Sequence, residues 1–437
     1  MTFEEADLII KDCLVLPITP PNLIKEGLIA VKGGVISYVG NVADAPKIKA
    51  EKMLEAHGKL AMPGLVNCHT HLAMTLFRGL AEDLPLDKWL RERIWPREAK
   101  LKAQDVYVGA LLGCLEQIKN GITCFADMYF YMSEVAQAVK KAGLRAALAS
   151  GIIETGDREK GEKMFETAVE FARNYRGYAD GRVTTFLGPH TVYTCSEELL
   201  AKVREKASQL GAGIHIHLAE SKEAAHKVMR EHGVSEVRLL EKLGFLGDDV
   251  LAAHCIHLTR EDMLALAKRG VKVAHNPVAN TKLAHGVAKV KELMDLGVTV
   301  GLGTDGAASN NSLDMFESMK IAALLQKTKY GDPSIMPNKT VLKMATFDGA
   351  EALGLEKRIG SLEVGKRADI ILVDLKRPNL TPLHDVFANL VYSCRGCDVD
   401  TVIVDGEIVM QNRKVKTLDE EEVMEKAEDA ALSLLTD

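Results

Sequence analysis

The sequence predicts an α/β protein, a (β/α)8 (TIM) barrel with a small β-sandwich formed by the N- and C-terminal segments. Between residues 62 and 330, eight short apolar segments alternate with segments of helical spacing. Several apolar segments end in His, Asp or Glu, the position at which such a barrel carries its functional side chains. Outside this region the chain has short alternating strands, which are typical of antiparallel sheets.

The expected barrel strands are apolar along most of their length, as strands of a sheet covered on both faces are. They cover residues 65–71, 121–127, 145–153, 182–190, 213–220, 250–257, 271–276 and 298–305. The helices expected between them include 103–119, 134–141, 197–210, 222–243 and 261–268. A glycine directly follows several of these helices, which fits a helix C-cap.

The two ends of the chain predict one composite domain. Short alternating strands are expected at 8–15, 27–39, 369–373 and 400–407, separated by turn signals of Gly and Asp-Gly type. We expect residues 1–61 and 361–437 to form the β-sandwich, with a charged helix over 418–435. Residues 62–360 then form the barrel domain.

Composition and charge indicate a globular protein and exclude several partners. The 437 residues are 47% hydrophobic and 27% charged, enough for a large core, and the net charge of −6 comes from interleaved charges of both signs. Nothing in this pattern favours nucleic acid or a membrane surface. The apolar runs are too short for a membrane span, and the acidic N-terminus is unlike a signal peptide. A cytoplasmic protein is expected, and whether it forms a homo-oligomer stays open.

The eight cysteines are scattered, mostly within apolar runs, which suits small buried side chains in a reducing compartment. Only Cys394 and Cys397 form a C-x-x-C pair. Without a second pair, this is weak evidence for a zinc or redox site.

Side chains able to bind a metal end several of the expected strands. They are His69 and His71, His217, His254, His275 and Asp305. One His-x-His alone would carry little information, because residues two apart face the same side of any strand. A lone histidine is more often a core or cap residue, but the repetition of such groups at successive strand ends favours a metal site.

Zinc binds imidazole and carboxylate groups, and a catalytic site keeps one position open for water. His69, His71, His217 and Asp305 would supply four ligands from three strands. His215 competes with His217, because both face the same side of the fifth strand. We favour His217, which stands at the end of the strand, one layer above His215.

Three residues are candidates for the proton chemistry. Glu220 lies three residues after His217 and would carry a proton near the metal without binding it. The alternative for Glu220 is a solvated carboxylate in the first turn of a helix, stabilised by the helix dipole. His254 is placed to hydrogen-bond the attacking water, and Asp305 can both bind metal and accept a proton from that water.

This set of residues resembles the amidohydrolase superfamily. Three stretches, 62–71, 76–84 and 303–311, are similar more narrowly to the 5-methylthioadenosine/S-adenosylhomocysteine deaminases, a family that includes 5'-deoxyadenosine deaminases. The resemblance extends to 360–369 and so covers nearly the whole chain. The His/Cys/Cys zinc deaminases have a different pattern, H-x-E with P-C-x-x-C, which is absent here.

The resemblance implies a metal-dependent hydrolase that deaminates the adenine ring of 5'-substituted adenosines at C6, giving the inosine analogue and ammonia. The substrates implied are 5'-deoxyadenosine, 5'-methylthioadenosine, S-adenosylhomocysteine and adenosine. It also implies one zinc per subunit, with iron or manganese as alternatives. By this resemblance Glu220 protonates the ring nitrogen next to C6, Asp305 takes a proton from the attacking water, and His254 orients that water.

The resemblance extends to substrate binding. Glu98 matches the carboxylate that holds the ribose hydroxyls in this family, although Glu98 could also be a surface helix residue. A carboxylate can accept two short charge-assisted hydrogen bonds from such a pair of hydroxyls. His190 matches the histidine that lines the nucleoside pocket.

One departure from the family concerns the 5' substituent. At the position of Ser150, just before Gly151, some members of the family have an arginine. In those members the arginine meets the carboxylate of the homocysteine tail. A second arginine of the following loop has only an uncertain counterpart, Arg158. Loss of a bidentate guanidinium weakens the case for S-adenosylhomocysteine. Neutral 5' groups are therefore favoured at least as strongly as the charged homocysteine tail.

Two alternative functions stay open on the sequence alone. The first is an amidohydrolase that acts on another ring, as a guanine or triazine deaminase or a chlorotriazine hydrolase. Glu98 argues against it, because a bare base offers no hydroxyls. The second is a non-catalytic, metal-free homologue of the barrel, and the presence of every expected ligand argues against that.

Overall fold

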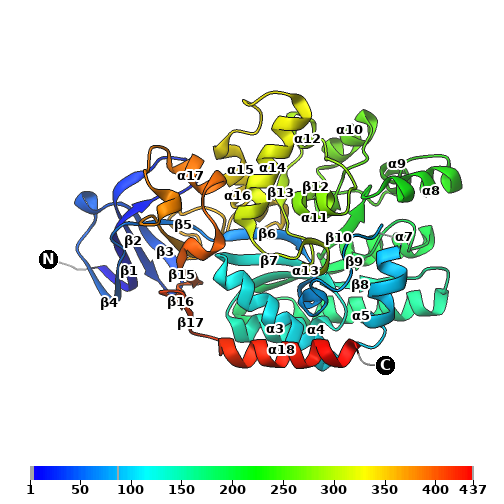
Figure 1. The fold of residues 1–437 in the computed structure, drawn as a ribbon, viewed down its shortest axis with the longest axis horizontal. Coiled ribbons are helices and arrows are strands. Elements are labelled where there is room, and N and C mark those ends of the chain that lie inside the picture. The colour runs from blue at the N-terminus through cyan, green and yellow to red at the C-terminus, as the bar shows by residue number, and fades with distance from the viewer. Residues whose placement is uncertain (1–3, 86–87, 436–437) are drawn as a thin grey trace.

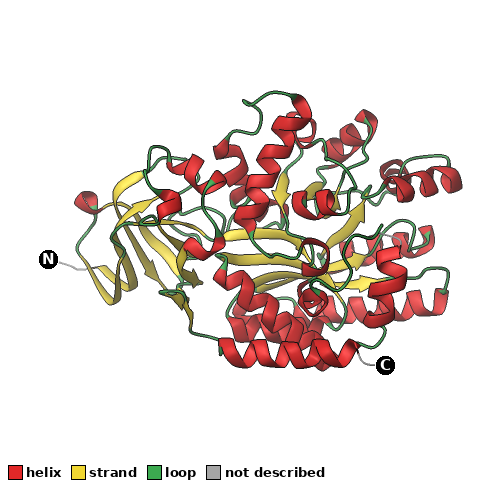
Figure 2. Ribbon diagram, viewed as in Figure 1, coloured by secondary structure: helices red, strands yellow, loops and turns green. Residues whose placement is uncertain are grey.

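The computed structural model describes residues 4–85 and 88–435, which form two sheets with helices around one of them (Figures 1 and 2). One sheet has eight parallel strands, and the other has nine strands from the two ends of the chain. The predicted fold, a (β/α)8 barrel beside a β unit that both termini build, is confirmed.

The barrel strands follow one another around the sheet in chain order. They are β6 (Leu65–Thr70), β7 (Ile122–Tyr129), β8 (Arg145–Ile152), β9 (Val183–Pro189), β10 (Gly213–Leu218), β11 (Val250–His254), β12 (Lys272–His275) and β13 (Val300–Leu302). Every residue of β6, β7 and β8 is buried, as in a sheet covered on both faces. The N–H of Asp305 donates to the carbonyl of His69 at 2.9 Å and so joins the end of β13 to β6.

Helices cover the outside of the barrel (Figure 2). The longer ones are α3 (Ala103–Lys119), α4 (Met132–Ala142), α5 (Arg158–Tyr175), α7 (Glu197–Leu210), α8 (Lys222–His232), α10 (Arg260–Arg269) and α14 (Met315–Tyr330). The single helix predicted over 222–243 is wrong. Gly233 ends α8 in the left-handed region at φ 68°, and the hydroxyl of Ser235 then caps a separate helix, α9 (Glu236–Lys242).

Shorter helices lie in connections between barrel strands and in the part of the chain after β13. They are α6 (Tyr178–Gly181), α11 (Pro277–Lys282), α12 (Val290–Asp295), α13 (Ala307–Asn310), α15 (Asn338–Met344), α16 (Phe347–Ala352) and α17 (Val386–Tyr392). None of the helices in the described parts of the chain has the length and apolar character needed to cross a membrane.

The two ends of the chain share the second sheet. Its strands are β1 (Glu4–Val15), β2 (Ile24–Lys32), β3 (Val35–Asn41), β4 (Ile48–Glu55), β5 (Lys59–Pro63), β14 (Ile370–Asp374), β15 (Val399–Val404), β16 (Glu407–Gln411) and β17 (Lys414–Val415). β5 lies between β1 and β14, so N- and C-terminal strands are directly hydrogen-bonded. The C-terminal helix α18 (Glu420–Leu435) packs along α3 (Figure 1).

This second sheet lies at the amino-terminal end of the barrel strands, on the left in Figure 1. Arg145, the first residue of β8, donates to Asp369 at 2.8 Å and to Asp405 at 2.6 Å. The carboxyl ends of the strands therefore point away from the terminal sheet. The predicted domain boundary at 61–62 falls inside β5. The division into two domains stays a prediction, and residues 1–3, 86–87 and 436–437 of these domains lie outside the described ones.

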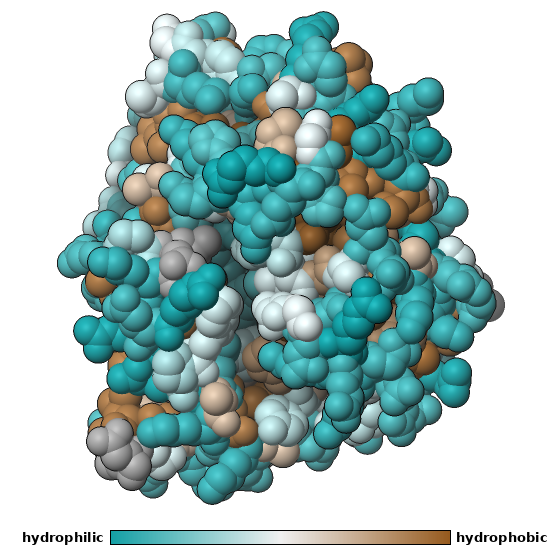
Figure 3. Space-filling model, turned by 90° about the vertical axis from the view of Figure 1, so that its right-hand side faces the viewer, coloured by the Kyte–Doolittle hydropathy of each residue, from teal (hydrophilic) through white to brown (hydrophobic). Residues whose placement is uncertain are grey.

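The connection after β6 folds over the carboxyl end of the barrel. It contains η2 (Leu72–Phe77), η3 (Trp89–Ile94) and α2 (Trp95–Glu98). Trp89 and Ile94 are buried although they lie outside the barrel sheet. Figure 3 shows a face of the molecule, turned from the right-hand side of Figure 1, with a hollow near its centre.

Candidate metal centre and active site

Three of the candidate functional segments contain a residue with left-handed backbone conformation at or just after the end of a barrel strand. Ala219 has φ 50°, His254 has φ 72° and Asp305 has φ 66°. Non-glycine residues adopt this conformation rarely, at a cost of order 1–3 kcal/mol each. β10 ends just before Ala219 and β11 ends at His254, whereas Asp305 lies three residues after the end of β13.

Gly303 permits close contact between the segment that carries Asp305 and the ends of β6 and β12. A Cβ atom on Gly303 would lie 2.3 Å from Oδ1 of Asn276 and 3.0 Å from the backbone nitrogen of His69. Any side chain at this position would therefore push β6 and the end of β12 apart. Gly303 lets the segment that carries Asp305 lie directly beside the segment that carries His69.

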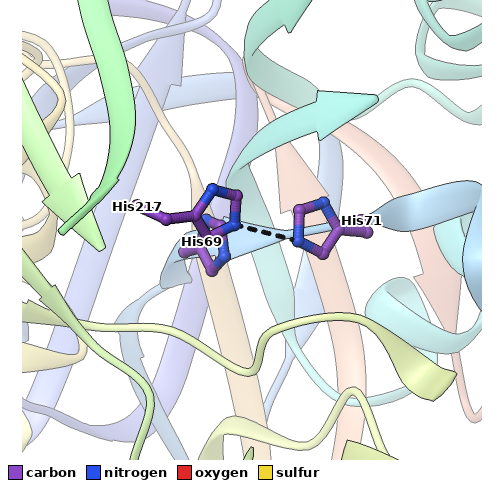
Figure 4. Close-up of side chains that lie close together, drawn as sticks. All are labelled: His69, His71 and His217. Carbon is purple, nitrogen blue, oxygen red and sulfur yellow. Dashed lines mark hydrogen bonds between the residues drawn. The ribbon is translucent and has the colours of Figure 1, made fainter. Parts of the chain in front are cut away.

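The structure brings together His69, His71 and His217, whose ligand atoms all lie within 4.8 Å of one another. His69 and His71 come from the end of β6, and His217 comes from β10 (Figure 4). The Nε2 atoms of His71 and His217 are 3.3 Å apart. His69, His254 and Asp305 form a second group of the same size, so the two groups share His69.

Asp305 joins this cluster from the segment after β13, which lies beside the end of β6. Its Oδ1 atom lies 3.5 Å from Nε2 of His69 and 3.4 Å from Nε2 of His71. The same oxygen accepts a hydrogen bond from the N–H of Gly306 at 2.7 Å. The four side chains that the sequence predicts as metal ligands therefore lie together, since His69 and His71 contact Asp305 and also cluster with His217.

The second ring nitrogen of each of three histidines has a hydrogen-bond partner behind it. Nδ1 of His71 donates to the carbonyl of Met128 at 2.7 Å, and Nδ1 of His217 donates to the carbonyl of His190 at 3.0 Å. Nδ1 of His254 lies 2.8 Å from Oδ1 of Asn280. Such partners fix the ring orientation and the tautomer, and they leave Nε2 directed at the cluster.

His215 occupies the corresponding place behind His69. Its Nε2 atom lies 2.8 Å from Nδ1 of His69, and its ring is fully buried. His215 is not a member of either group of converging ligand atoms found in the described chain. Its contact is with a predicted ligand and not with the point on which the ligands converge.

The chemistry of these donors fits a divalent metal. Nε2 of His69 is buried, faces Asp305, and has no hydrogen-bond partner within the described residues. Burial lowers the pKa of His69 to about 4 and the pKa of His217 well below its usual value, so both rings are neutral, as metal ligands must be. Burial would raise the pKa of Asp305, but contacts with His69 and the neighbouring histidines lower it, which favours the carboxylate.

A cavity of about 760 Å³, counted to its open mouth, lies over this cluster. Its wall combines aromatic and aliphatic side chains with a group of polar ones, as in a site for a small organic ligand that also carries polar groups. The apolar lining includes Trp89, Ile94, Trp95, Met128, Tyr129, Phe130, Ile153, Tyr193 and Leu283. The polar lining includes His71, Glu98, His190, His217, Glu220, His254, Asp305 and Ser309.

Glu220 stands in this wall beside His254. Its Oε1 atom lies 3.8 Å from Nε2 of His254 and 3.4 Å from Nδ1 of His285. The backbone before it is held by Glu236, whose buried carboxylate accepts the N–H of Ala219 at 3.0 Å. The carboxyl of Glu220 is thus close to the converging ligands without belonging to either group.

Glu98 and His190 both line this cavity. Glu98 ends α2 and accepts the hydroxyl of Tyr129 at 2.7 Å, and burial of its carboxyl raises its pKa. His190 follows β9, with Nδ1 3.2 Å from the hydroxyl oxygen of Thr194. Burial lowers the pKa of His190 to about 3, so its ring is neutral.

Ser150 and Arg158 do not line this cavity. Ser150 is buried on β8 and lines a neighbouring cavity, which shares Gly151 and Glu98 with the first. Arg158 is the first residue of α5, has an exposed side chain and pairs with Glu198 at 2.9 Å. It lines a third hollow, next to Trp95 and Tyr193.

Several residues of the site were not predicted from the sequence. Trp95 lies three residues before Glu98 in the cavity wall, and Tyr129 follows the predicted strand 121–127 at a strand end, like the histidines that were recognised. Asn280 and His285 lie in the connection after β12, where no periodic pattern marks them. Cys394 and Cys397 are not members of the metal-binding groups found in the described residues.

Comparison with known proteins shows the family of this chain. The model of the Amidohydrolase family matches residues 60–409. A 5'-deoxyadenosine deaminase from Methanosarcina acetivorans is 51% identical over 431 residues, which cover 98% of this chain and 99% of the relative. A 5-methylthioadenosine/S-adenosylhomocysteine deaminase from Moorella thermoacetica is 51% identical over 417 residues, or 95% of this chain and 97% of the relative.

A solved structure of an adenosine deaminase from Xanthomonas campestris, with bound zinc, has the same fold. It is 34% identical, superposes with a TM-score of 0.96, and the match covers 99% of each chain. The family match includes both the barrel strands and all the converging side chains at their ends. The chain therefore belongs to the amidohydrolase family.

Proposed function

We propose that this amidohydrolase is a zinc-dependent deaminase of 5'-substituted adenosines. It replaces the amino group at C6 of the adenine ring by oxygen from water, and it releases the inosine analogue and ammonia. The substrates are 5'-deoxyadenosine, 5'-methylthioadenosine, S-adenosylhomocysteine and adenosine. The relatives that are half identical over the full chain are deaminases of such nucleosides, which supports this assignment.

One observation carries the proposal. A single cavity is lined by the candidate ligands His71, His217 and Asp305, by the candidate proton donor Glu220, and by Glu98, which suits a pair of hydroxyls. A substrate of this site therefore needs both a ring that can be attacked by water and a sugar. A nucleoside has both.

We propose His69, His71, His217 and Asp305 as the residues that hold the metal. Bound there, a divalent metal would lower the pKa of a water molecule towards about 7 and so would supply a nucleophile at neutral pH. The neutral rings of His69 and His217 and the carboxylate of Asp305 are the states that such binding requires.

The remaining roles follow from the positions of the side chains in the cavity. Glu220 gives its proton to the ring nitrogen next to C6, which makes C6 more electrophilic. Asp305 takes a proton from the attacking water, and His254 orients that water through Nε2, because its Nδ1 is held by Asn280. The C6–N bond then breaks as the amino group takes the proton held by Asp305 and leaves as ammonia. The ring nitrogen keeps the proton that it received, and the proton of the new C6 hydroxyl passes to Glu220, which leaves a carbonyl at C6 and restores both carboxyl groups.

Recognition of the sugar falls to Glu98. Its carboxylate already accepts the hydroxyl of Tyr129 through Oε1, so Oε2 and the second lone pair of Oε1 are left for the 2' and 3' hydroxyls. The apolar rings of Trp95 and Phe130 line the space beside it. A guanine or triazine ring would leave this carboxylate without partners.

The test is a steady-state comparison of the four adenosines by loss of adenine absorbance, with ammonia measured as the second product. We expect turnover of 5'-deoxyadenosine and 5'-methylthioadenosine, its loss after chelation, and its return with zinc. Parallel reactions with iron and manganese report whether either replaces zinc. Hydrolysis of guanine or a chlorotriazine, with no turnover of any adenosine, would overturn the assignment in favour of another ring.

A further inference from the structure

His285 is a buried histidine next to the active site that the proposed reaction does not yet use. It lies in the connection after α11, and its side chain is 6% exposed. Both ring nitrogens are buried, and neither has a hydrogen-bond partner among residues 4–85 and 88–435. A buried polar group of this kind normally has a partner, so its position requires an explanation.

The side chain that faces His285 is Glu220. Nδ1 of His285 lies 3.4 Å from Oε1 of Glu220, an ion-pair distance without the alignment of a hydrogen bond. His254 approaches the same oxygen at 3.8 Å from the cavity side. His285 does not line the cavity and approaches Glu220 from outside it. Catalytic hydrogen bonds are often long in ligand-free structures and tighten when substrate binds.

The backbone holds His285 firmly in this place. Its N–H donates to the carbonyl of Asn280 at 2.9 Å, and Asn280 is also the residue that holds the ring of His254. The neighbours on both sides, Ala284 at φ 55° and Gly286 at φ 114°, have left-handed backbones that turn this short segment inward. One connection therefore fixes both histidines that approach Glu220.

We propose that His285 is the positioning residue of the proton donor: its Nδ1 hydrogen-bonds Oε1 of Glu220 and holds the carboxyl with Oε2 turned to the substrate ring. This inference rests on the proposed role of Glu220 in the deamination. His285 does not touch the substrate, so its effect passes entirely through Glu220. Substrate binding should therefore depend on it little, and the chemical step should depend on it strongly.

The experiment is a double-mutant cycle between His285 and Glu220, measured with 5'-deoxyadenosine on the metal-loaded enzyme. His285→Phe keeps the ring volume without nitrogens, and His285→Asn keeps a hydrogen-bonding group near the position of Nδ1. We expect His285→Phe to lower kcat about ten- to a hundredfold, with KM within about threefold of wild type. His285→Asn should recover at least half of that loss on a logarithmic scale.

The Glu220→Gln background separates positioning from a structural role. There, His285→Phe should change kcat less than about twofold, because the carboxyl that it positions is already absent. His232→Phe is the matched control, since it breaks another His–Glu contact, 3.0 Å to Glu197, at the far end of α8. That variant should keep wild-type kcat.

Three results would overturn the inference: full kcat in His285→Phe, an equal loss in both backgrounds, or a loss explained by metal content alone. Elemental analysis of each variant decides the last case. Failure of the proposed function has a different signature, because wild-type enzyme would then deaminate no adenosine. The same cycle on the ring that the enzyme does hydrolyse would still show whether His285 acts through Glu220.

Discussion

Nδ1 of His69 and Nε2 of His215 lie 2.8 Å apart in the fully buried interior of the barrel. The two histidines of β10 therefore have different surroundings in the site. His217 faces the point where the candidate ligands converge, and His215 supports one of those ligands from behind. The contact therefore leads to separate predictions for two residues that lie only two positions apart.

Replacing His217 by Ala should remove the metal and the activity together. Replacing His215 by Ala removes the support of His69, which typically weakens metal affinity about 10- to 100-fold. We expect His215→Ala still to bind one metal per chain when metal is in excess. Elemental analysis of both dialysed variants, with and without added zinc, measures the difference. The reverse pattern would make His215 the ligand.

Replacing Glu220 by Gln should lower kcat by a factor of about 10² or more while the metal stays bound. Glutamine keeps the size and the hydrogen bonding of the side chain but has no proton to give. The matched control is Glu223→Gln, an exposed carboxylate three residues later, which should keep full activity. Near-normal turnover in Glu220→Gln would mean that the proton reaches the ring by another route.

Replacing Glu98 by Gln should lower kcat/KM for 5'-deoxyadenosine about ten- to a hundredfold, because charge-assisted hydrogen bonds to the ribose are lost. The same variant should turn over 2',3'-dideoxyadenosine almost as well as wild type does, since that substrate has no hydroxyl pair to bind. Steady-state kinetics on both substrates checks this. An equal loss on both would assign Glu98 to the structure of the cavity wall.

The lack of an arginine at position 150 predicts a preference for neutral 5' groups. No guanidinium at that position can meet a charged amino-acid tail, so S-adenosylhomocysteine should not be the best substrate by kcat/KM. Ser150→Arg should raise its kcat/KM relative to 5'-deoxyadenosine by roughly tenfold or more, provided that the new side chain reaches the tail.

Arg158 is the residue to examine if this prediction fails. Its guanidinium pairs with exposed Glu198 and lines a hollow that shares Trp95 with the main cavity. A wild-type preference of tenfold or more for S-adenosylhomocysteine would assign tail binding to another residue. Loss of that preference in Arg158→Ala would then identify Arg158.

Glu236 makes stability depend on pH. Burial raises the pKa of its carboxyl to about 7, whereas the same group in the unfolded chain has an ordinary pKa near 4.5. Between these values the folded protein holds a proton that the unfolded chain has released, so the free energy of unfolding falls as pH rises. Glu236→Gln should remove this loss while it keeps an acceptor for the N–H of Ala219.

The measurement for Glu236 is denaturant unfolding of wild type and Glu236→Gln at several pH values. Relative to wild type, the variant should gain about 1–3 kcal/mol between pH 4 and pH 8. All other titrating groups are common to both proteins and cancel in the difference. A difference that stays constant with pH would show that Glu236 does not titrate in this range.

The pattern of the sequence predicted all eight barrel strands, because buried parallel strands are the most apolar segments of such a chain. Their ends were predicted too late at several positions. The predicted strand 250–257 ends at His254, and 298–305 ends at Leu302. Left-handed backbones at residues such as Ala219 and His254 stop strands, and no hydrophobic pattern reveals a φ angle.

The side chains at strand ends could be predicted, but those that support them could not. The side chains of His69 and Asp305 are 236 residues apart in the chain, yet the barrel topology alone brings them together. The partner of His254, Asn280, lies in the short helix α11, and the partner of Ala219, Glu236, is the first residue of α9. Their positions depend on how each connection packs, which a single sequence does not encode in a periodic pattern.

The ion pairs of Arg145 have a consequence for how the chain is assembled. Its guanidinium is buried, and one of its two carboxylate partners, Asp405, lies 260 residues further along the chain. The other partner, Asp369, is itself 224 residues away, and until it leaves the ribosome β8 carries a charge that cannot be buried without a large penalty. The barrel of a nascent chain therefore stays incomplete until the C-terminal strands are made, and a chain truncated before Asp369 should be captured by chaperones or degraded.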